Sequence, residues 1–246
     1  MSKPKTAIVT GASSGLGLAI ADAYLKLGYN VVGNARTTER LQEAAASIGH
    51  PDNFLFAAGD ISLPSTTESL FATAIDNFGT VDILVANAGV FISKPFVDFT
   101  EDDVDSLVNT NLKGFVYPAQ AAARHMVANG SGHIVSITAC IAMQPNKSLP
   151  CLVTALIKGG LNHAVKALAI ELGDTGVQVN GVAPGIIDTP IFPRDPELWQ
   201  FLRTLAPNGK TGVPQDIVDA VLYLTGSSYV TGSIMTVDGG STAGTW

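Results

Sequence analysis

The chain has 246 residues, 46% of them hydrophobic and 14% charged, which excludes disorder of the chain as a whole and allows one large domain with a buried core. Its formal net charge of −7 and its lack of any basic run argue against nucleic-acid binding through clustered Lys and Arg. Gly, polar or charged residues interrupt every apolar stretch before the roughly 18 residues that span a bilayer. A strand-like segment begins directly after the N-terminus and leaves no room for a secretory signal, so we expect a soluble, cytoplasmic protein without membrane association.

Short runs rich in Val and Ile alternate with longer segments of helical period, which is typical of an α/β domain. The expected strands are Thr6–Thr10, Asn30–Gly33, Phe54–Ala58, Asp82–Ala86, His133–Thr138, Val177–Val182 and Ile234–Val237. Strands that are apolar throughout and are separated by helices predict a parallel sheet covered on both faces. We therefore predict a Rossmann-type, doubly wound sheet of seven parallel strands in a single domain over residues 1–246.

The first strand leads into the glycine-rich segment Thr10–Gly17, ahead of the first expected helix. Gly11 permits a sharp turn, Gly15 lets the backbone approach a pyrophosphate, and Gly17 permits close packing of helix on strand. The helix N-terminus beyond supplies N–H groups and the positive end of a dipole. The segment predicts a dinucleotide site with Gly11, Ser13, Ser14, Gly15, Leu16 and Gly17 as candidate ligands.

The end of the second strand reads Val31-Val32-Gly33-Asn34-Ala35-Arg36 and carries no acidic residue that could bind a ribose 2′-hydroxyl. Arg36 lies just beyond it, and a guanidinium suits bidentate binding of phosphate. We favour NADP(H) over NAD(H) on this basis. The alternative is a solvated Arg36 at the start of a helix over residues 37–47.

Two loops leave the carboxyl ends of strands, where ligands bind in open α/β sheets. One runs from Gly89 to about Thr100, and the other covers residues of about 185–212 and is rich in proline. The second is either a substrate lid or an ordinary connection. Its apolar residues suggest an apolar cleft for a carbonyl or alcohol substrate; they are Ile186, Ile187, Ile191, Phe192 and Trp199.

The T-G-x-x-x-G-x-G spacing resembles that of the short-chain dehydrogenase/reductase family. Further matches follow in order along nearly the whole chain: Asp60-Ile61, Asn87-Ala88-Gly89, Asn111 within Val108–Gly114, Pro184-Gly185 with Thr189, and Val237–Gly240. The resemblance implies hydride transfer between a nicotinamide cofactor and a carbonyl or alcohol. It adds Asp60, Ile61, Asn87, Ala88, Gly89, Lys158, Pro184, Gly185, Ile187 and Thr189 to the cofactor-binding candidates.

Members of that family use an Asn–Ser–Tyr–Lys group, in which the tyrosine phenol transfers the proton. The resemblance places Asn111 and Lys158 at the Asn and Lys positions of this group. Thr154 stands at the Tyr position, and Ala139, with Thr138 adjacent, stands at the Ser position. No tyrosine occurs between residues 118 and 222, and an aliphatic hydroxyl does not ionise near neutral pH, so Thr154 cannot replace a phenol directly.

Two main functions therefore stay open. The first is an NADP(H)-dependent oxidoreductase whose proton relay runs through Lys158, Asn111 and water. The second is a nucleotide-binding protein with little or no redox turnover that acts as a sensor or partner subunit. A different reaction in the same cleft is a third.

The resemblance also implies a homodimer or homotetramer formed through two long helices. The candidate contact residues are Phe115, Val116, Tyr117, Leu161, Val165 and Leu168, and core packing would explain most of them equally well. The two cysteines, Cys140 and Cys151, are expected to be reduced and mostly buried, although a redox-sensitive site there stays open. We expect no metal site, because their spacing matches no zinc motif.

Overall fold

The computed structural model describes residues 3–244 and contains one seven-stranded sheet with the order β3-β2-β1-β4-β5-β6-β7. The strands are β1 (Thr6–Thr10), β2 (Asn30–Ala35), β3 (Phe54–Ala58), β4 (Ile83–Ala86), β5 (Gly132–Ile137), β6 (Val177–Pro184) and β7 (Ile234–Val237). All six neighbouring pairs are parallel. The sheet confirms the predicted fold class, although β2 and β6 each extend two residues further than their apolar runs.

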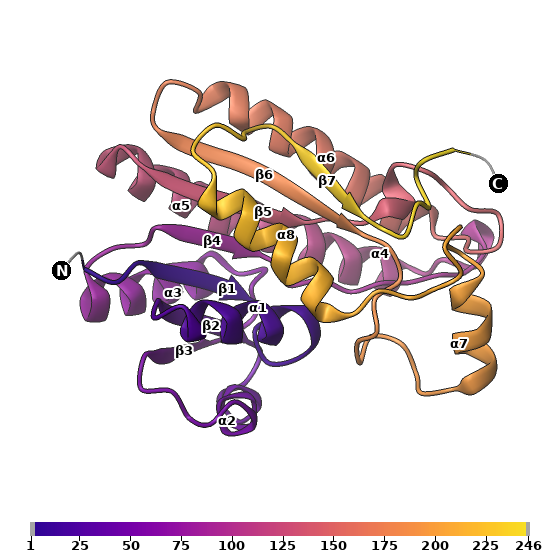
Figure 1. The fold of residues 1–246 in the computed structure, drawn as a ribbon, viewed down its shortest axis with the longest axis horizontal. Coiled ribbons are helices and arrows are strands. Elements are labelled where there is room, and N and C mark those ends of the chain that lie inside the picture. Colours follow the sequence, from indigo (N-terminus) through magenta and orange to yellow (C-terminus); the bar gives the residue numbers. More distant parts are fainter. Residues whose placement is uncertain (1–2, 245–246) are drawn as a thin grey trace.

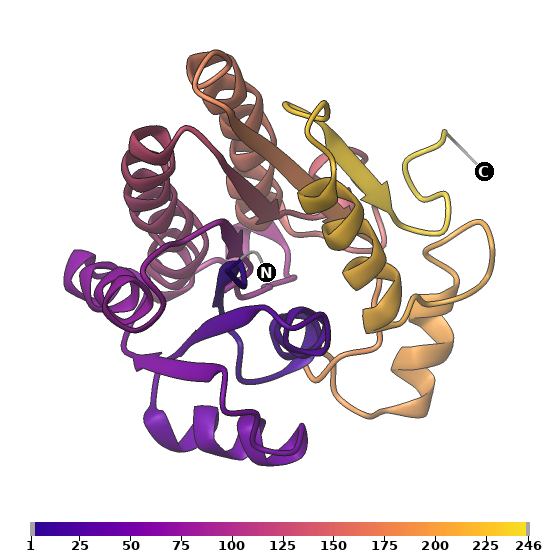
Figure 2. The same cartoon turned by 60° about the vertical axis from the view of Figure 1, so that its left-hand side comes forward.

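Helices cover both faces of this sheet (Figures 1 and 2). They are α1 (Gly15–Lys26), α2 (Thr38–Ser47), α3 (Pro64–Phe78), α4 (Glu101–Leu107), α5 (Gly114–Asn129), α6 (Leu152–Glu171), α7 (Pro196–Arg203) and α8 (Pro214–Gly226). A π-helical turn, η2 (Val108–Lys113), joins α4 to α5. Single-turn 3₁₀ segments lie at η1 (Phe96–Asp98) and η3 (Cys140–Ala142).

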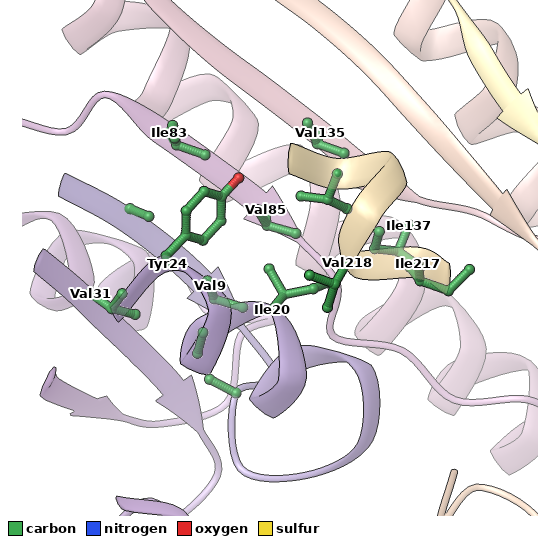
Figure 3. Packing of buried hydrophobic residues seen from close by; sticks show 14 of the residues in the cluster. Val9, Ile20, Tyr24, Val31, Ile83, Val85, Val135, Ile137, Ile217 and Val218 are labelled. Carbon is green, nitrogen blue, oxygen red and sulfur yellow. The ribbon is translucent and has the colours of Figure 1, made fainter. Parts of the chain in front are cut away.

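The core consists of two apolar layers, one on each face of the sheet. Ala7 and Val9 of β1 face the layer under α1 and α8, whereas Ile8 faces the layer under α3, α5 and α6. Figure 3 shows the first layer, in which Ile20 of α1 packs close to Val218 of α8. Both faces of the strands are therefore buried, which is why the strands read as continuous apolar runs.

The direction of chain progression reverses between β1 and β4, because β2 and β3 lie on one side of β1 and the later strands lie on the other. Ligands of open α/β sheets bind at such a switch point, beyond the carboxyl ends of the strands. In Figure 1 the arrowheads of the strands point toward the side of the molecule that carries α7. This end is where the predicted cofactor loop and the predicted lid meet.

Three of the six residues that the sequence suggested for subunit contact are buried. Phe115 of α5 and Leu161 and Val165 of α6 belong to the core layer on that face of the sheet. The exposed apolar side chains on these helices include Val116, which the sequence suggested, together with Leu156 and Ile170. Between residues 3 and 244, none of the helices combines the length and apolar character needed to cross a bilayer.

Candidate active site

A cavity of about 1110 Å³ opens at the carboxyl ends of the strands. It extends from the glycine loop and the end of β2, past the end of β5 and Lys158, to the segment that leads into α7. Every predicted catalytic and cofactor-binding residue except Gly17 and Asn111 lines this cavity. Both lie behind the wall of the cavity. Gly17 lies where α1 packs on the glycine loop, and Asn111 lies behind the loop after β4. Of the apolar residues predicted for the substrate cleft, all but Trp199 line the cavity.

The glycine loop has the backbone that its sequence requires. Gly11 and Gly15 have φ of 67° and 54°, in the left-handed region that favours glycine. A Cβ atom on Gly17 would lie 2.2 Å from the carbonyl oxygen of Gly11, so only glycine lets α1 approach the loop this closely. Ser14 makes no side-chain hydrogen bond to the first turn of α1, which leaves the N–H groups there for a ligand. These features fit a pyrophosphate.

Thr10 and Asn87 join the glycine loop to the end of β4. The Thr10 hydroxyl accepts hydrogen bonds from the backbone N–H groups of Asn87 and Ala88, each at 3.0 Å. The Asn87 amide donates in return to the carbonyl oxygen of Thr10 at 2.9 Å. Thr10 is a site residue that sequence reasoning did not single out, although its place at the head of the motif is a usable signal.

Two arginines line the end of the cavity beyond β2. Arg36 follows the strand directly, and Arg40, which the sequence analysis did not consider, lies one helical turn further on in α2. Both side chains are exposed, and neither forms an ion pair within residues 3–244. The Asn34 amide donates hydrogen bonds to the carbonyl oxygens of Ala57 and Gly59. Asp60, whose carboxylate accepts from the N–H of Ser62, lines the same end of the cavity.

Lys158 and Asn111 meet beside Gly89. A Cβ atom on Gly89 would lie 3.1 Å from Asn111 Oδ1 and 3.4 Å from Lys158 Nζ. Lys158 is buried in α6, and its ammonium donates to the carbonyl oxygen of Ile137 at 2.7 Å. Burial lowers the pKa of Lys158 from 10.5 to about 8, because desolvation disfavours the charged form. Asn111 lies in the π-helical turn, a distortion that is frequent at functional sites.

The Thr154 hydroxyl is not free to face a ligand. It donates to the carbonyl oxygen of Ile92 at 3.0 Å and accepts from the N–H of the same residue at 3.4 Å. The Thr138 hydroxyl is also engaged, since it donates to the carbonyl oxygen of Val182 at 3.2 Å. Ala139 follows it at the wall of the cavity and contributes only a methyl group. The Thr154 and Thr138 hydroxyls are thus both engaged in hydrogen bonds within the protein.

The two cysteines are free thiols, and Cys140 lines the cavity. Burial raises the pKa of Cys140 to about 12 and also raises the pKa of Cys151, so both stay protonated at neutral pH. A nucleophilic thiolate is therefore disfavoured. No cluster of three or more His, Cys, Asp or Glu side chains suited to a metal occurs in the part of the chain that the structure describes.

Comparison with known proteins gives the family. Residues 5–197 match the family described as short chain dehydrogenase. The chain belongs to this family. It is 36% identical to the (2S)-[(R)-hydroxy(phenyl)methyl]succinyl-CoA dehydrogenase subunit BbsD of Thauera aromatica, over 96% of each chain. It is 33% identical to gluconate 5-dehydrogenase of Gluconobacter oxydans, over 96% of this chain and 94% of that protein.

Solved structures of short-chain dehydrogenases share the whole fold. A short-chain type dehydrogenase/reductase from Mycobacterium marinum has 32% identity and a TM-score of 0.92, covering 98% of this chain and 96% of its own. A 3-ketoacyl-(acyl-carrier-protein) reductase from Brucella melitensis, solved with NADH, has 29% identity and a TM-score of 0.89, covering 98% of this chain and all of its own. The seven-stranded sheet and its helices are thus those of the family.

Proposed function

We propose that this short-chain dehydrogenase is an NADP(H)-dependent oxidoreductase that interconverts a carbonyl and an alcohol with Lys158 as its proton donor and acceptor. The observation that supports this assignment is the buried Lys158 ammonium beside Gly89 and Asn111, with a pKa of about 8. A general acid works best when its pKa lies near the operating pH, and Lys158 meets this condition without a tyrosine.

The nicotinamide, when bound, supplies the hydride in reduction and accepts it in oxidation. As hydride reaches the carbonyl carbon, Lys158 releases a proton to the carbonyl oxygen, directly or through a water, and the neutral amine takes the proton back in oxidation. Only one of the three ammonium N–H groups is used by Ile137, which leaves two for substrate or water. Asn111 uses one amide N–H on Val90, and the other can hold a relay water.

The preference for NADP(H) is supported by Arg36 and Arg40 at the cavity end beyond β2. Two guanidinium groups without ion-pair partners among residues 3–244 suit a 2′-phosphate, and no carboxylate at the end of β2 repels it. The Brucella melitensis relative was solved with NADH, so the preference has to be measured on this chain. A cytoplasmic location and a homodimer or homotetramer complete the proposal.

The test has a binding arm and a turnover arm. The intact protein is titrated with NADPH and NADH by fluorescence, and NADPH is expected to bind more tightly. The Arg36→Ala and Arg40→Ala variants should weaken NADPH binding while leaving NADH binding nearly unchanged. Equal loss for both nucleotides would contradict the assignment of a 2′-phosphate site.

In the turnover arm, a panel of carbonyl substrates is assayed with the intact protein and with Lys158→Met. Loss of a positioned general acid should lower the rate roughly 10²–10⁴-fold. Lys166→Met is the matched control, because Lys166 lies on the same helix and is exposed. Full activity in Lys158→Met would overturn the proposed role of Lys158.

The second candidate is a nucleotide-binding partner subunit with little or no turnover. It is favoured by the commitment of the Thr154 hydroxyl to Ile92 and by the methyl group at Ala139. One relative is itself named as a subunit. Activity that appears only in Thr154→Tyr or Ala139→Ser/Thr154→Tyr, and not in the intact protein, would support this candidate over the first.

A further inference from the structure

In the segment Val90–Ile92, just after β4, the backbones of the first and third residues are hydrogen-bonded by two buried side chains from different elements. Asn111 Oδ1 accepts from the N–H of Val90 at 2.8 Å, and Asn111 Nδ2 donates to its carbonyl oxygen at 2.9 Å. Thr154 makes the same pair of bonds with Ile92. Asn111 and Thr154 are only 2% and 1% exposed.

The side chains of Val90 and Ile92 pack on a small apolar cluster. They pack there against Leu107, Val153 and Ile157. Phe91 lies between these two residues and lines the cavity, as does Val90. The hydrogen bonds and the apolar cluster together fix the orientation of this short segment. Phe91 is therefore the aromatic side chain that the segment places at the cavity wall.

Across the cavity, Phe91 faces the segment that leads into α7. Its ring centroid lies 6.2 Å from that of Phe192, with an interplanar angle of 61°. Phe192 in turn lies 6.1 Å from Trp199 of α7, at 80°. Both spacings fall in the range of favourable edge-to-face pairs. Arg194 lies over the Trp199 ring and forms an ion pair with Asp188, so these contacts link α7 to the loop after β6.

We infer that Thr154 is a positioning residue that, through Ile92, holds Phe91 against Phe192 as an aromatic wall selecting substrates with a flat apolar group beside the reacting carbonyl or alcohol carbon. This inference rests on the proposed oxidoreductase function. It assigns to Thr154 a role that needs a short side chain carrying both a donor and an acceptor. Threonine and serine meet that requirement, whereas valine, which has the same shape as threonine, does not.

The first measurement does not depend on turnover. Hydrogen–deuterium exchange of the amides in residues 90–94 is followed in the intact protein, Thr154→Val, Thr154→Ser and the remote control Thr73→Val. Thr154→Val should exchange roughly tenfold faster there, since it loses a buried hydrogen-bond pair. Thr154→Ser and Thr73→Val should match the intact protein. Unchanged exchange in Thr154→Val would overturn the inference even if the protein is an active oxidoreductase.

The second measurement compares an aryl ketone, acetophenone, with a small aliphatic ketone, 2-butanone, in steady-state kinetics. Thr154→Val and Phe91→Ala should raise KM for acetophenone about tenfold, with little change in KM for 2-butanone, and Thr154→Ser should restore the preference. Equal effects on both ketones, or on kcat alone, would contradict the positioning role. Absence of turnover in every variant would overturn the proposed function, while the exchange data would still decide the role of Thr154.

Discussion

At the scale of single residues, the proposed chemistry centres on one buried cation. Lys158 has no carboxylate ion-pair partner in the described chain and is satisfied only by the carbonyl oxygen of Ile137. An isolated buried charge is costly, and the group responds by a lowered pKa. The same burial that disfavours the ammonium makes it a proton donor suited to neutral or mildly alkaline conditions.

The pKa of Lys158 predicts opposite pH dependence for the two directions of the reaction. Lowering the pKa from 10.5 to about 8 means that Lys158 is charged below pH 8 and neutral above it. Carbonyl reduction needs the charged form, so its kcat/KM should fall as the pH rises through about 8. Alcohol oxidation needs the neutral form and should rise over the same interval.

Initial rates measured from pH 6 to pH 10 in both directions check this expectation. A reduction rate that stays constant to pH 10 would show that another group supplies the proton. Because kcat/KM reports the free enzyme, the profile is compared directly with the pKa of Lys158 in the free protein.

At the scale of elements, the cofactor end of the site depends on how closely α1 packs on the loop after β1. Gly17 makes this contact possible, because its hydrogen points toward both the Gly11 carbonyl and the Asn87 amide. Asn87 in turn bonds to Thr10, so one contact holds the ends of two strands together. We therefore expect the proposed dinucleotide binding and the stability of the fold to be coupled at this position.

Gly17→Ala should disturb both properties at once. The added Cβ would lie 2.2 Å from the Gly11 oxygen and 2.5 Å from Asn87 Nδ2, so the loop must shift. We expect a loss of about 1–3 kcal/mol in the free energy of unfolding, as for other overpacked sites, and a loss of NADPH binding. Urea unfolding and nucleotide titration measure the two effects.

Gly160→Ala provides the control within a helix. No atom lies within 4 Å of a Cβ added at Gly160, so alanine should stabilise α6 by about 0.5–1 kcal/mol and leave nucleotide binding unchanged. If Gly17→Ala behaved like Gly160→Ala, close packing at the glycine loop would not be needed for the cofactor.

At the scale of the whole molecule, the α5 and α6 side of the sheet carries apolar residues that this single chain leaves exposed. Leu156 is 69% exposed and Ile170 is 84% exposed, both on α6. Large apolar side chains in such positions are typical of surfaces that other chains cover. The resemblance to a family of dimers and tetramers suggested the same two helices; of the residues it suggested, Phe115, Leu161 and Val165 belong to the core and Val116 is exposed.

Leu156→Glu and Ile170→Glu should reduce the assembly to single chains or smaller oligomers, because a buried glutamate without a partner opposes association. Light scattering coupled to gel filtration reports the mass. Leu27→Glu, at a 57% exposed site after α1, should leave the assembly intact. A mass unchanged by either α6 variant would place the subunit contact elsewhere.

The sequence by itself determined the sheet, the glycine loop and the family, because these depend on signals within short segments. Apolar runs separated by helical segments specified the parallel sheet, and the spacing of Gly11, Gly15 and Gly17 specified the phosphate loop. The end of β2 was not specified in this way. The strand continues through Asn34 and Ala35, because both residues pair with β3, and this pairing leaves no signal in an apolar run.

Tertiary structure decided which partners the cavity residues have and how deeply they are buried. Thr154 bonds to a residue 62 positions away, and Thr10 bonds to one 77 positions away, so neither partner can be read from neighbouring residues. Three further features likewise arise only when distant segments pack together. They are the burial that lowers the pKa of Lys158, the approach of Phe91 to Phe192 and the place of Arg40 in the cavity wall. The physical reason is that hydrogen-bond partners and desolvation are properties of the packed chain, whereas periodicity and turn glycines act locally.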